Sequence, residues 1–221
     1  MERSDWLKER RRVAEERFDT LWAAIYDDNW GSWIGPTHQE FIQRFLSLCP
    51  PQATMLDAAC GTGKYWPLIL ASGRAVRGTD QSREMLARAK AKFPDVPVEK
   101  IGLQEMQYQE AFEGAVCMDA MENVFPEDWP VVLHNLYRAI KPEGYLYFTV
   151  EIAAESDIQN AFAAGREEGL PIVYGEWMLE GGYHYYPSIK QVKAWLEGTR
   201  FRLVAEAVSE DYNHFLVQKA G

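Results

Sequence analysis

Cationic side chains are scarce in this sequence relative to acidic ones. The 221 residues include 23 Lys and Arg against 33 Asp and Glu, a formal net charge of −10 at pH 7, with a pI near 5.0. Nucleic-acid binding draws much of its affinity from Lys and Arg that release counterions, so this balance disfavours nucleic acid as the main partner. A small ligand or a protein substrate fits the charge better.

Cysteines are few, and long apolar runs are missing. Cys49, Cys60 and Cys117 are an odd number without C-x-x-C spacing, which predicts buried thiols in a reducing compartment and no metal site. Residues 1–12 carry charge but no apolar signal-peptide core, and no later run approaches the length of a membrane span. We therefore expect a cytoplasmic protein without a membrane partner; the sequence does not indicate its oligomeric state.

The sequence is organised around residues 53–64. Apolar residues 53–56 are typical of a buried parallel strand, and Gly61 and Gly63 allow a sharp turn with no Cβ in the way of a ligand. Residues 66–70 then read as the start of a helix. Strand, glycine turn and helix together form a unit that binds nucleotides, although an ordinary tight turn is the alternative.

The glycine pattern discriminates between nucleotides. A dinucleotide fingerprint needs G-x-G-x-x-G, but Gly61 and Gly63 are followed by Lys64, Tyr65 and Trp66, which counts against an NAD-dependent oxidoreductase. The stretch instead resembles the first motif of the class I S-adenosylmethionine-dependent methyltransferases, an acid followed by G-x-G-x-G. Asp57 occupies the acidic position, Gly61 and Gly63 match the second and third glycines, and Ala59 replaces the first.

A second resemblance to this family follows at Asp80. The predicted strand 74–80 ends in this acid, about 23 positions after Asp57, a spacing at which a carboxylate meets ribose hydroxyls. Ser82 is the predicted N-cap of the next helix. The resemblance places Asp80 and Gln81 at the ribose, whereas the alternative is that Asp80 merely ends a strand.

The loop after the predicted strand 98–101 departs from the family pattern. The family usually has an acid here that holds the adenine amino group, but this sequence has Leu103. The resemblance therefore places Leu103 and Gln104 at the adenine, with Glu105 as another polar candidate. A solvated loop is the alternative for Gln104.

Acidic residues also follow the predicted strand 114–118. Ligands of open parallel sheets bind outside the carboxyl ends of the strands, and the resemblance places Met118 and Asp119 at the sulfonium end of the cofactor. Glu122 is a candidate base or an anchor for a cationic substrate; capping of the predicted helix 127–140 is the alternative. The turn 141–144 before the predicted strand 145–150 resembles a recurrent structural feature of the family.

Segments on either side of this core are expected to cover the site. Helices predicted over 5–26 and 37–48 form a lid if the resemblance holds, with Tyr26 at the cofactor and aromatic rings suited to a sulfonium cation; a packed helical hairpin is the alternative. An insertion over 151–187 is expected to select the substrate. In it, His184 is a candidate base, because imidazole exchanges protons near neutral pH, or else a structural hydrogen-bonding residue.

A helix is predicted over 188–197, followed by strands 201–208 and 212–218 that form an antiparallel hairpin. We expect His214 to be structural, on an exposed last strand.

These features predict a Rossmann-like α/β fold with a seven-stranded, mostly parallel sheet and a C-terminal antiparallel hairpin. One domain is expected over 1–221, with a helical lid (1–50), a cofactor-binding core (51–150), a cap after the fifth strand (151–187), and a final helix and hairpin (188–221). The resemblance implies a methyltransferase that uses S-adenosylmethionine, releases S-adenosylhomocysteine and methylates a small-molecule acceptor by in-line displacement. A non-catalytic S-adenosylmethionine-binding or partner subunit is the alternative; an NAD-dependent oxidoreductase is the less favoured one. These motifs do not indicate whether an O, N, C or S atom of the acceptor is methylated.

Overall fold

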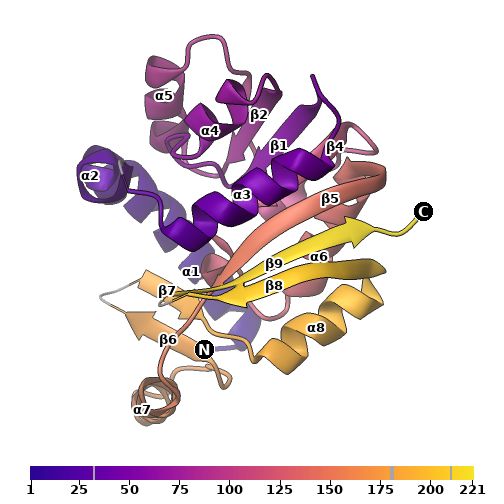
Figure 1. Cartoon of the computed structure of the whole chain (residues 1–221). Coiled ribbons are helices and arrows are strands. Elements are labelled where there is room, and N and C mark those ends of the chain that lie inside the picture. The colour runs from indigo at the N-terminus through magenta and orange to yellow at the C-terminus, as the bar shows by residue number, and fades with distance from the viewer. Residues whose placement is uncertain (32, 180–181, 210) are drawn as a thin grey trace.

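A computed structural model describes residues 1–31, 33–179, 182–209 and 211–221, and a seven-stranded sheet forms its centre (Figure 1). The first five strands pair in parallel, and the last two are antiparallel to their neighbours. The predicted sheet is confirmed. In spatial order the strands are β3 (Val98–Lys100), β2 (Ala75–Asp80), β1 (Thr54–Ala58), β4 (Phe112–Cys117), β5 (Ile140–Glu151), β9 (Tyr212–Lys219) and β8 (Phe201–Val208).

The central strands are apolar on both faces, because helices cover both sides of the sheet. Alternate residues point to opposite faces: Leu56 packs in one hydrophobic cluster and Met55 in the other, and Phe148 and Tyr147 divide in the same way. The face with Met55 is covered by α3 (Pro36–Leu48), which passes in front of the strands in Figure 1, and by α4 (Trp66–Ala71) and α5 (Arg83–Lys92). The other face is covered by α6 (Trp129–Ala139) and α8 (Ile189–Gly198).

Helix starts follow the predicted capping residues. Ser82 Oγ accepts a hydrogen bond from Met85 N, and Ser188 Oγ accepts one from Gln191 N, so each hydroxyl satisfies an otherwise unpaired amide of the first helical turn. These two caps fix where the chain turns from a loop into α5 and α8.

The N-terminal segment is helical for longer than its apolar spacing predicts. α1 (Arg3–Arg17) and α2 (Ala23–Tyr26) alternate with π-helical turns over Phe18–Trp22 and Asp27–Gly31. The predicted end at residue 26 is therefore wrong. π-Helical turns are rare in proteins, and those that occur are often found at functional sites. This pair brings aromatic side chains toward the carboxyl ends of the strands.

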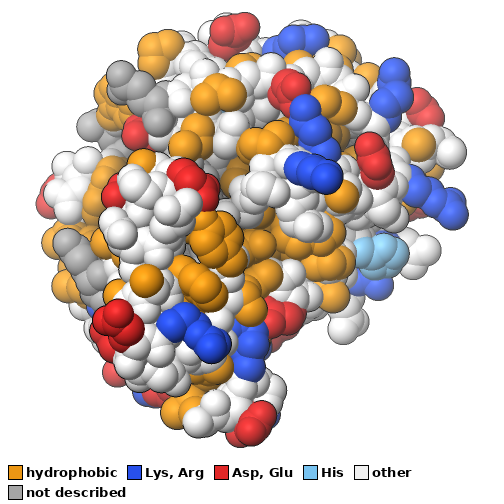
Figure 2. Space-filling model, turned by 90° about the horizontal axis from the view of Figure 1, so that it is seen from below, with side chains coloured by type: hydrophobic (Ala, Val, Ile, Leu, Met, Phe, Trp, Pro, Cys, Tyr) orange, Lys and Arg blue, Asp and Glu red, His pale blue; other side chains and the backbone are white. Residues whose placement is uncertain are grey.

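The segment after β5 forms a cap. It consists of α7 (Glu155–Glu167) and a two-stranded sheet, β6 (Glu176–Leu179) with β7 (Gly182–Tyr185). Arg3 ties the cap to the N-terminus, because its guanidinium donates to both carboxylate oxygens of Glu176 and also to Glu127. Figure 2 shows this side of the molecule from below: hydrophobic side chains gather in its centre among charged ones.

Two sequence predictions about the last strands need correction. The turn predicted over 141–144 lies within β5: Ile140 pairs with Phe112 and Tyr145 with Gly114, so the four residues form an irregularity, with Glu143 at φ +62°. The strand with His214 is not exposed, because β9 inserts between β5 and β8. His214 is fully buried, and its ring contacts Tyr147 Oη at 2.9 Å and Ser209 Oγ at 3.0 Å.

Cys49, Cys60 and Cys117 are free and buried, as predicted. Within the described ranges, no helix combines the length and the apolar character that crossing a bilayer requires. The predicted turn between β8 and β9 includes Glu210, which lies outside the described residues.

Candidate functional site

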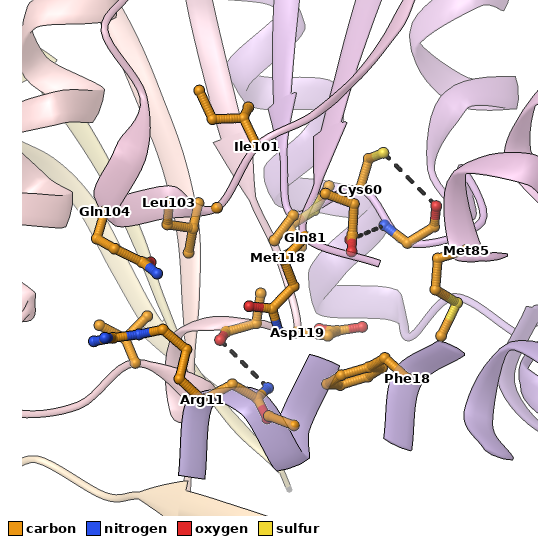
Figure 3. A pocket seen from close by; sticks show the side chains of 18 of the residues that line it. Arg11, Phe18, Cys60, Gln81, Met85, Ile101, Leu103, Gln104, Met118 and Asp119 are labelled. Atoms are coloured by element: carbon orange, nitrogen blue, oxygen red, sulfur yellow. Dashed lines mark hydrogen bonds between the residues drawn. The ribbon is translucent and has the colours of Figure 1, made fainter. Parts of the chain in front are cut away.

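A cavity lies at the carboxyl ends of β1, β2 and β4, where ligands of open α/β sheets bind. It brings together ten of the eleven residues that the sequence assigned to the cofactor; Gly63 is not among the lining residues. Figure 3 shows Leu103 and Gln104 on one side of this cavity, Cys60 and Met85 on the other, and Met118 and Asp119 between them. The ten are Tyr26, Asp57, Ala59, Gly61, Asp80, Gln81, Leu103, Gln104, Met118 and Asp119.

The two glycines of the turn have different roles. Gly61 has φ +52°, and a Cβ there would meet no atom within 4 Å, so its backbone borders open space. Gly63 has φ +78°, and a Cβ there would lie 2.7 Å from the ring of Trp66. Gly63 thus permits the packing of the loop on Trp66, and of the two glycines only Gly61 lines the cavity. Ala59 has φ +59°, a conformation that suits the glycine usual in the family motif.

Asp57, which is buried, and Asp80, which is half-buried, both place carboxyl groups in this cavity. Asp80 accepts from Gly61 N and Ser82 N, both at 2.8 Å, and Asp57 accepts from Trp66 Nε1 at 2.8 Å. Burial raises the pKa of Asp57 to about 7 and that of Asp80 to about 6. Two carboxyl groups poised near neutral pH are suited to a ligand that carries hydroxyl groups and positive charge.

The side of the cavity near Leu103 is mainly apolar. Ile101, Leu103 and Phe18 contribute to its lining, and Gln104 supplies an amide. Glu105 does not line the cavity; its carboxylate accepts from Gly102 N at 3.3 Å and closes a turn. A flat apolar ring with polar edges fits this side of the cavity.

Asp119 is held by donors from separate parts of the chain. Its Oδ1 lies 2.9 Å from His38 Nε2, and its Oδ2 accepts from Tyr65 Oη and lies 3.2 Å from Lys64 Nζ. Burial alone would raise the pKa of Asp119, but the hydrogen bond from His38 and the charge of Lys64 outweigh it and hold the pKa at about 2. Asp119 has φ +52°, and its amide donates to Thr149 Oγ1 at 2.8 Å.

A second cavity of about 650 Å³ adjoins the first, a volume typical of sites for small molecules. Both cavities are lined by Arg10, Ala14, Phe18, Tyr26, Lys64, Tyr65, Asp119, Asn123 and Tyr183. The second cavity is also lined by aromatic side chains from the N-terminal helical segment (Trp22 and Trp30), from the loop before α3 (Trp33) and from the last strand (Tyr212). Two ligands in these cavities would meet at the shared wall.

Glu122 lines the second cavity from a 3-10 helix, Met121–Asn123. Its Oε1 accepts from Asn123 Nδ2 at 3.1 Å, whereas its Oε2 is buried without a hydrogen-bond partner among the described residues. Burial and the nearby charge of Glu151 raise the pKa of Glu122 well above its ordinary value. Asp128, not Glu122, occupies the N-cap position of α6, so the capping alternative is wrong.

His184 lines the second cavity from β7. Its Nδ1 lies 3.0 Å from Tyr186 Oη and 3.0 Å from Glu151 Oε2. The side chain is 26% exposed, so its ring is accessible from the solvent. His184 and Glu122 therefore border the same cavity and not the cavity at the glycine turn.

Sequence reasoning missed several residues of this site. His38 lies on α3 and Glu151 at the end of β5, far from any recognised motif. Lys64 and Tyr65 follow the glycine turn directly, so their position in the motif could have identified them as lining residues. In the part of the chain that the structure describes, no group of three or more His, Cys, Asp or Glu side chains is arranged to hold a metal ion.

Comparison with known proteins gives matches at both the sequence and the fold level. Residues 56–148 match the sequence model of a family described as "Methyltransferase domain". A putative methyltransferase, YqeM, of Bacillus subtilis (strain 168) is 27% identical over 139 residues, 60% of this chain and 52% of that protein. The dTDP-4-amino-2,3,4,6-tetradeoxy-D-glucose N,N-dimethyltransferase of Saccharopolyspora spinosa is 25% identical over 143 residues, 64% of this chain and 57% of that protein. The chain thus spans little more than half the length of these curated relatives.

Among solved structures, magnesium protoporphyrin IX methyltransferase (ChlM) from Synechocystis PCC 6803 with bound S-adenosylhomocysteine superposes with a TM-score of 0.69. The sequences are 14% identical, and the match covers 95% of this chain and 99% of that chain. At this identity the likeness concerns the fold.

Proposed function

Because this chain carries a methyltransferase domain with the fold of the class I S-adenosylmethionine-dependent methyltransferases, we propose that it transfers a methyl group from S-adenosylmethionine to a small-molecule acceptor. The observation that carries the proposal is the pair of adjoining cavities with one shared wall. One cavity has the features of a nucleoside site, and the other has the size of a small-molecule site. The Saccharopolyspora relative bears the name of an enzyme that methylates a small sugar nucleotide.

The residues of the first cavity fit S-adenosylmethionine. Asp80 is suited to accept from the ribose hydroxyls, and the apolar side with Leu103 and the amide of Gln104 suits the adenine. Arg10 lines both cavities, and within the described ranges its Nε is buried without a hydrogen-bond partner, which suits the methionine carboxylate. Asp57 provides negative charge near the methionine part.

The bound cofactor would supply a methyl group activated by the positive charge of its sulfur. Tyr26, Tyr65 and Asp119 line both cavities, so they border the place where methyl group and acceptor meet. Their contribution is to orient the acceptor for in-line displacement and to exclude water, since alignment of the reacting atoms supplies most of the rate enhancement in such a transfer. Aromatic rings at this wall also stabilise a sulfonium cation.

Calorimetric titration of the purified protein with S-adenosylmethionine, S-adenosylhomocysteine and NAD tests the cofactor assignment. We expect binding of the first two and none of NAD. Asp80→Ala should weaken binding by about 1–3 kcal/mol, because the ribose hydroxyls lose their acceptor, whereas Asp95→Ala, at an exposed position, should leave it unchanged. Binding of NAD alone, or equal affinities for all variants, would contradict the proposal.

Methyl transfer is tested by following S-adenosylhomocysteine formation with a panel of small amines, phenols, thiols and acids. An acceptor-dependent increase in product is the expected result. Tight cofactor binding with no turnover on any acceptor class would favour a non-catalytic S-adenosylmethionine-binding subunit.

A further inference from the structure

An unpartnered acidic oxygen marks the wall of the second cavity. Glu122 is 5% exposed, and in the part of the chain that the structure describes its Oε2 makes no hydrogen bond, although Oε1 accepts one from Asn123. Burying a polar atom without a hydrogen-bond partner costs the full desolvation free energy of the group. A buried atom of this kind therefore needs an explanation. A ligand in the cavity with an N–H or O–H group aimed at Oε2 would supply the missing partner.

The cations around the cavity do not pair with Glu122. In the described ranges, Lys64 is engaged by Asp119, and the guanidinium of Arg17 lies over the ring of Trp22, 5.8 Å from its centroid. Arg10 also lines this cavity, and among the described residues its Nε has no hydrogen-bond partner. The other groups that line this cavity or interact electrostatically with Glu122 are Tyr26, His38, Cys117, Asp119, Glu151, Tyr183, His184, Tyr186, Asp211 and Tyr212. The cavity is thus lined by four acids, Asp119, Glu122, Glu151 and Asp211, and by three cations, Arg10, Arg17 and Lys64, which favours a ligand that carries a cationic group.

Aromatic rings form another wall of this cavity. Trp30 lies with its ring centroid 5.5 Å from that of Trp22 and 5.6 Å from that of Tyr26. Trp33 also lines the cavity and is 65% exposed. Flat aromatic surfaces bind planar apolar bodies and attract cations. The ligand therefore has a flat apolar body as well as a donor group.

We propose that the methyl acceptor is a primary or secondary amine on a flat apolar body, and that Glu122 binds its nitrogen and takes its proton. The proposal rests on the proposed methyltransferase function and specifies its substrate class. It also gives Glu122 a direct role at the reacting nitrogen, where the sequence offered a base and an anchor as open choices. Burial supports this role, because it raises the proton affinity of the carboxylate.

The reaction balances without another reactant. At pH values below its raised pKa the carboxyl group of Glu122 is protonated in the empty cavity, and it releases that proton when the ammonium form of the acceptor binds. The resulting carboxylate then takes one proton from the ammonium, which leaves a neutral amine with a lone pair. That lone pair forms the new N–C bond to the methyl group, and the C–S bond breaks with both electrons remaining on sulfur. The products are S-adenosylhomocysteine, a methylated ammonium ion and a protonated Glu122, so the one proton released per transfer is the proton that Glu122 loses on binding.

Matched ligands test the proposal without turnover. We would titrate 2-phenylethylamine, 2-phenylethanol and phenylacetate into protein saturated with S-adenosylhomocysteine, since these probes share one ring and differ in the terminal group. We expect the amine to bind at least about tenfold more tightly than the alcohol, in line with a hydrogen bond to a charged group, and the acid to bind most weakly. Repeating the titration in buffers of different ionisation enthalpy should show about one proton released with the amine and none with the alcohol.

Two variants localise the effect. Glu122→Gln keeps the shape of the side chain and should abolish both the amine preference and the proton release, while S-adenosylhomocysteine affinity and the melting temperature show that the fold and the cofactor site are retained. Asp95→Asn removes a charge from an exposed residue that lines neither cavity, so it should retain both. Equal binding of the three probes, no binding of the amine at millimolar concentration, or an amine preference that survives Glu122→Gln would overturn the proposal. Loss of S-adenosylhomocysteine binding by the unmodified protein would instead contradict the proposed function.

Discussion

Asp119→Asn should destabilise the fold strongly, although Asn preserves the size of the side chain. The carboxylate is buried at the junction of α3, the glycine turn and β4, and it lies within 3.2 Å of Lys64 Nζ and 2.9 Å of His38 Nε2. Its pKa is lowered from 3.8 to about 2, and a shift of about 2 units corresponds to about 2.5 kcal/mol of stability at pH 7. Because Lys64, whose side chain is 9% exposed, would lose its counter-charge, the total loss is expected to reach about 3–4 kcal/mol.

Urea unfolding at pH 7, followed by tryptophan fluorescence, measures this free energy of unfolding. Asp5→Asn is the control, because Asp5 pairs with Lys8 at the surface, where both side chains are more than 60% exposed, and it should cost less than about 1 kcal/mol. The double variant Lys64→Met/Asp119→Asn should be more stable than Asp119→Asn alone, since no buried charge then lacks a partner.

The pH dependence gives a separate check on the same ion pair. The folded pKa of Asp119 lies below its unfolded value, so the stabilisation is complete above about pH 4 and is lost as pH falls through about 2. The stability difference between the unmodified protein and Asp119→Asn should therefore shrink below pH 4. A loss of less than about 1 kcal/mol at pH 7, or a difference that does not change with pH, would refute this account of Asp119.

Three further outcomes follow from the geometry. Gly63→Ala should lower the free energy of unfolding by about 2–3 kcal/mol, because its Cβ would meet Trp66 at 2.7 Å, whereas Gly61→Ala should cost about 1 kcal/mol; equal losses in urea unfolding would contradict the packing argument. Burial raises the pKa of Asp80 to about 6, so this carboxyl is protonated in the empty site at low pH, and calorimetric affinity for S-adenosylmethionine should fall below about pH 6 by up to roughly tenfold per pH unit. A flat profile would remove this carboxylate from cofactor binding. His184→Ala should lower kcat and leave S-adenosylhomocysteine affinity unchanged, since His184 lines the second cavity and not the first; unchanged kcat would exclude a role of His184 in turnover.

The first cavity was largely predictable from sequence because its residues follow directly from local signals. Apart from Tyr26 on α2, each predicted residue lies at or just beyond the end of a strand, and parallel strands bring their carboxyl ends to one edge of the sheet. Asp57 and Asp80 could thus be assigned to one site from their positions alone. The same logic failed for Gly63, because a glycine that faces a ligand and one that packs against Trp66 are identical in the sequence.

The second cavity was much less predictable. His38, Asp119 and Lys64 come from α3, the end of β4 and the glycine turn, and no local pattern indicates that they meet. The exposure of the strand with His214 was predicted wrongly for a similar reason. The sequence of this strand fits an exposed edge strand and a central strand equally well, and His214 is buried because β9 inserts between β5 and β8.

The sequence by itself determined the order of strands and helices, the glycine turn, the helix caps at Ser82 and Ser188, and the carboxylates that end β1 and β2. These depend on backbone conformation and apolar periodicity, which act over a few residues. Only the tertiary structure decided that Asp119 is paired and that Glu122 has an oxygen without a partner. Both outcomes depend on burial and on charges from distant segments, and such desolvation and pairing arise only when the segments pack together.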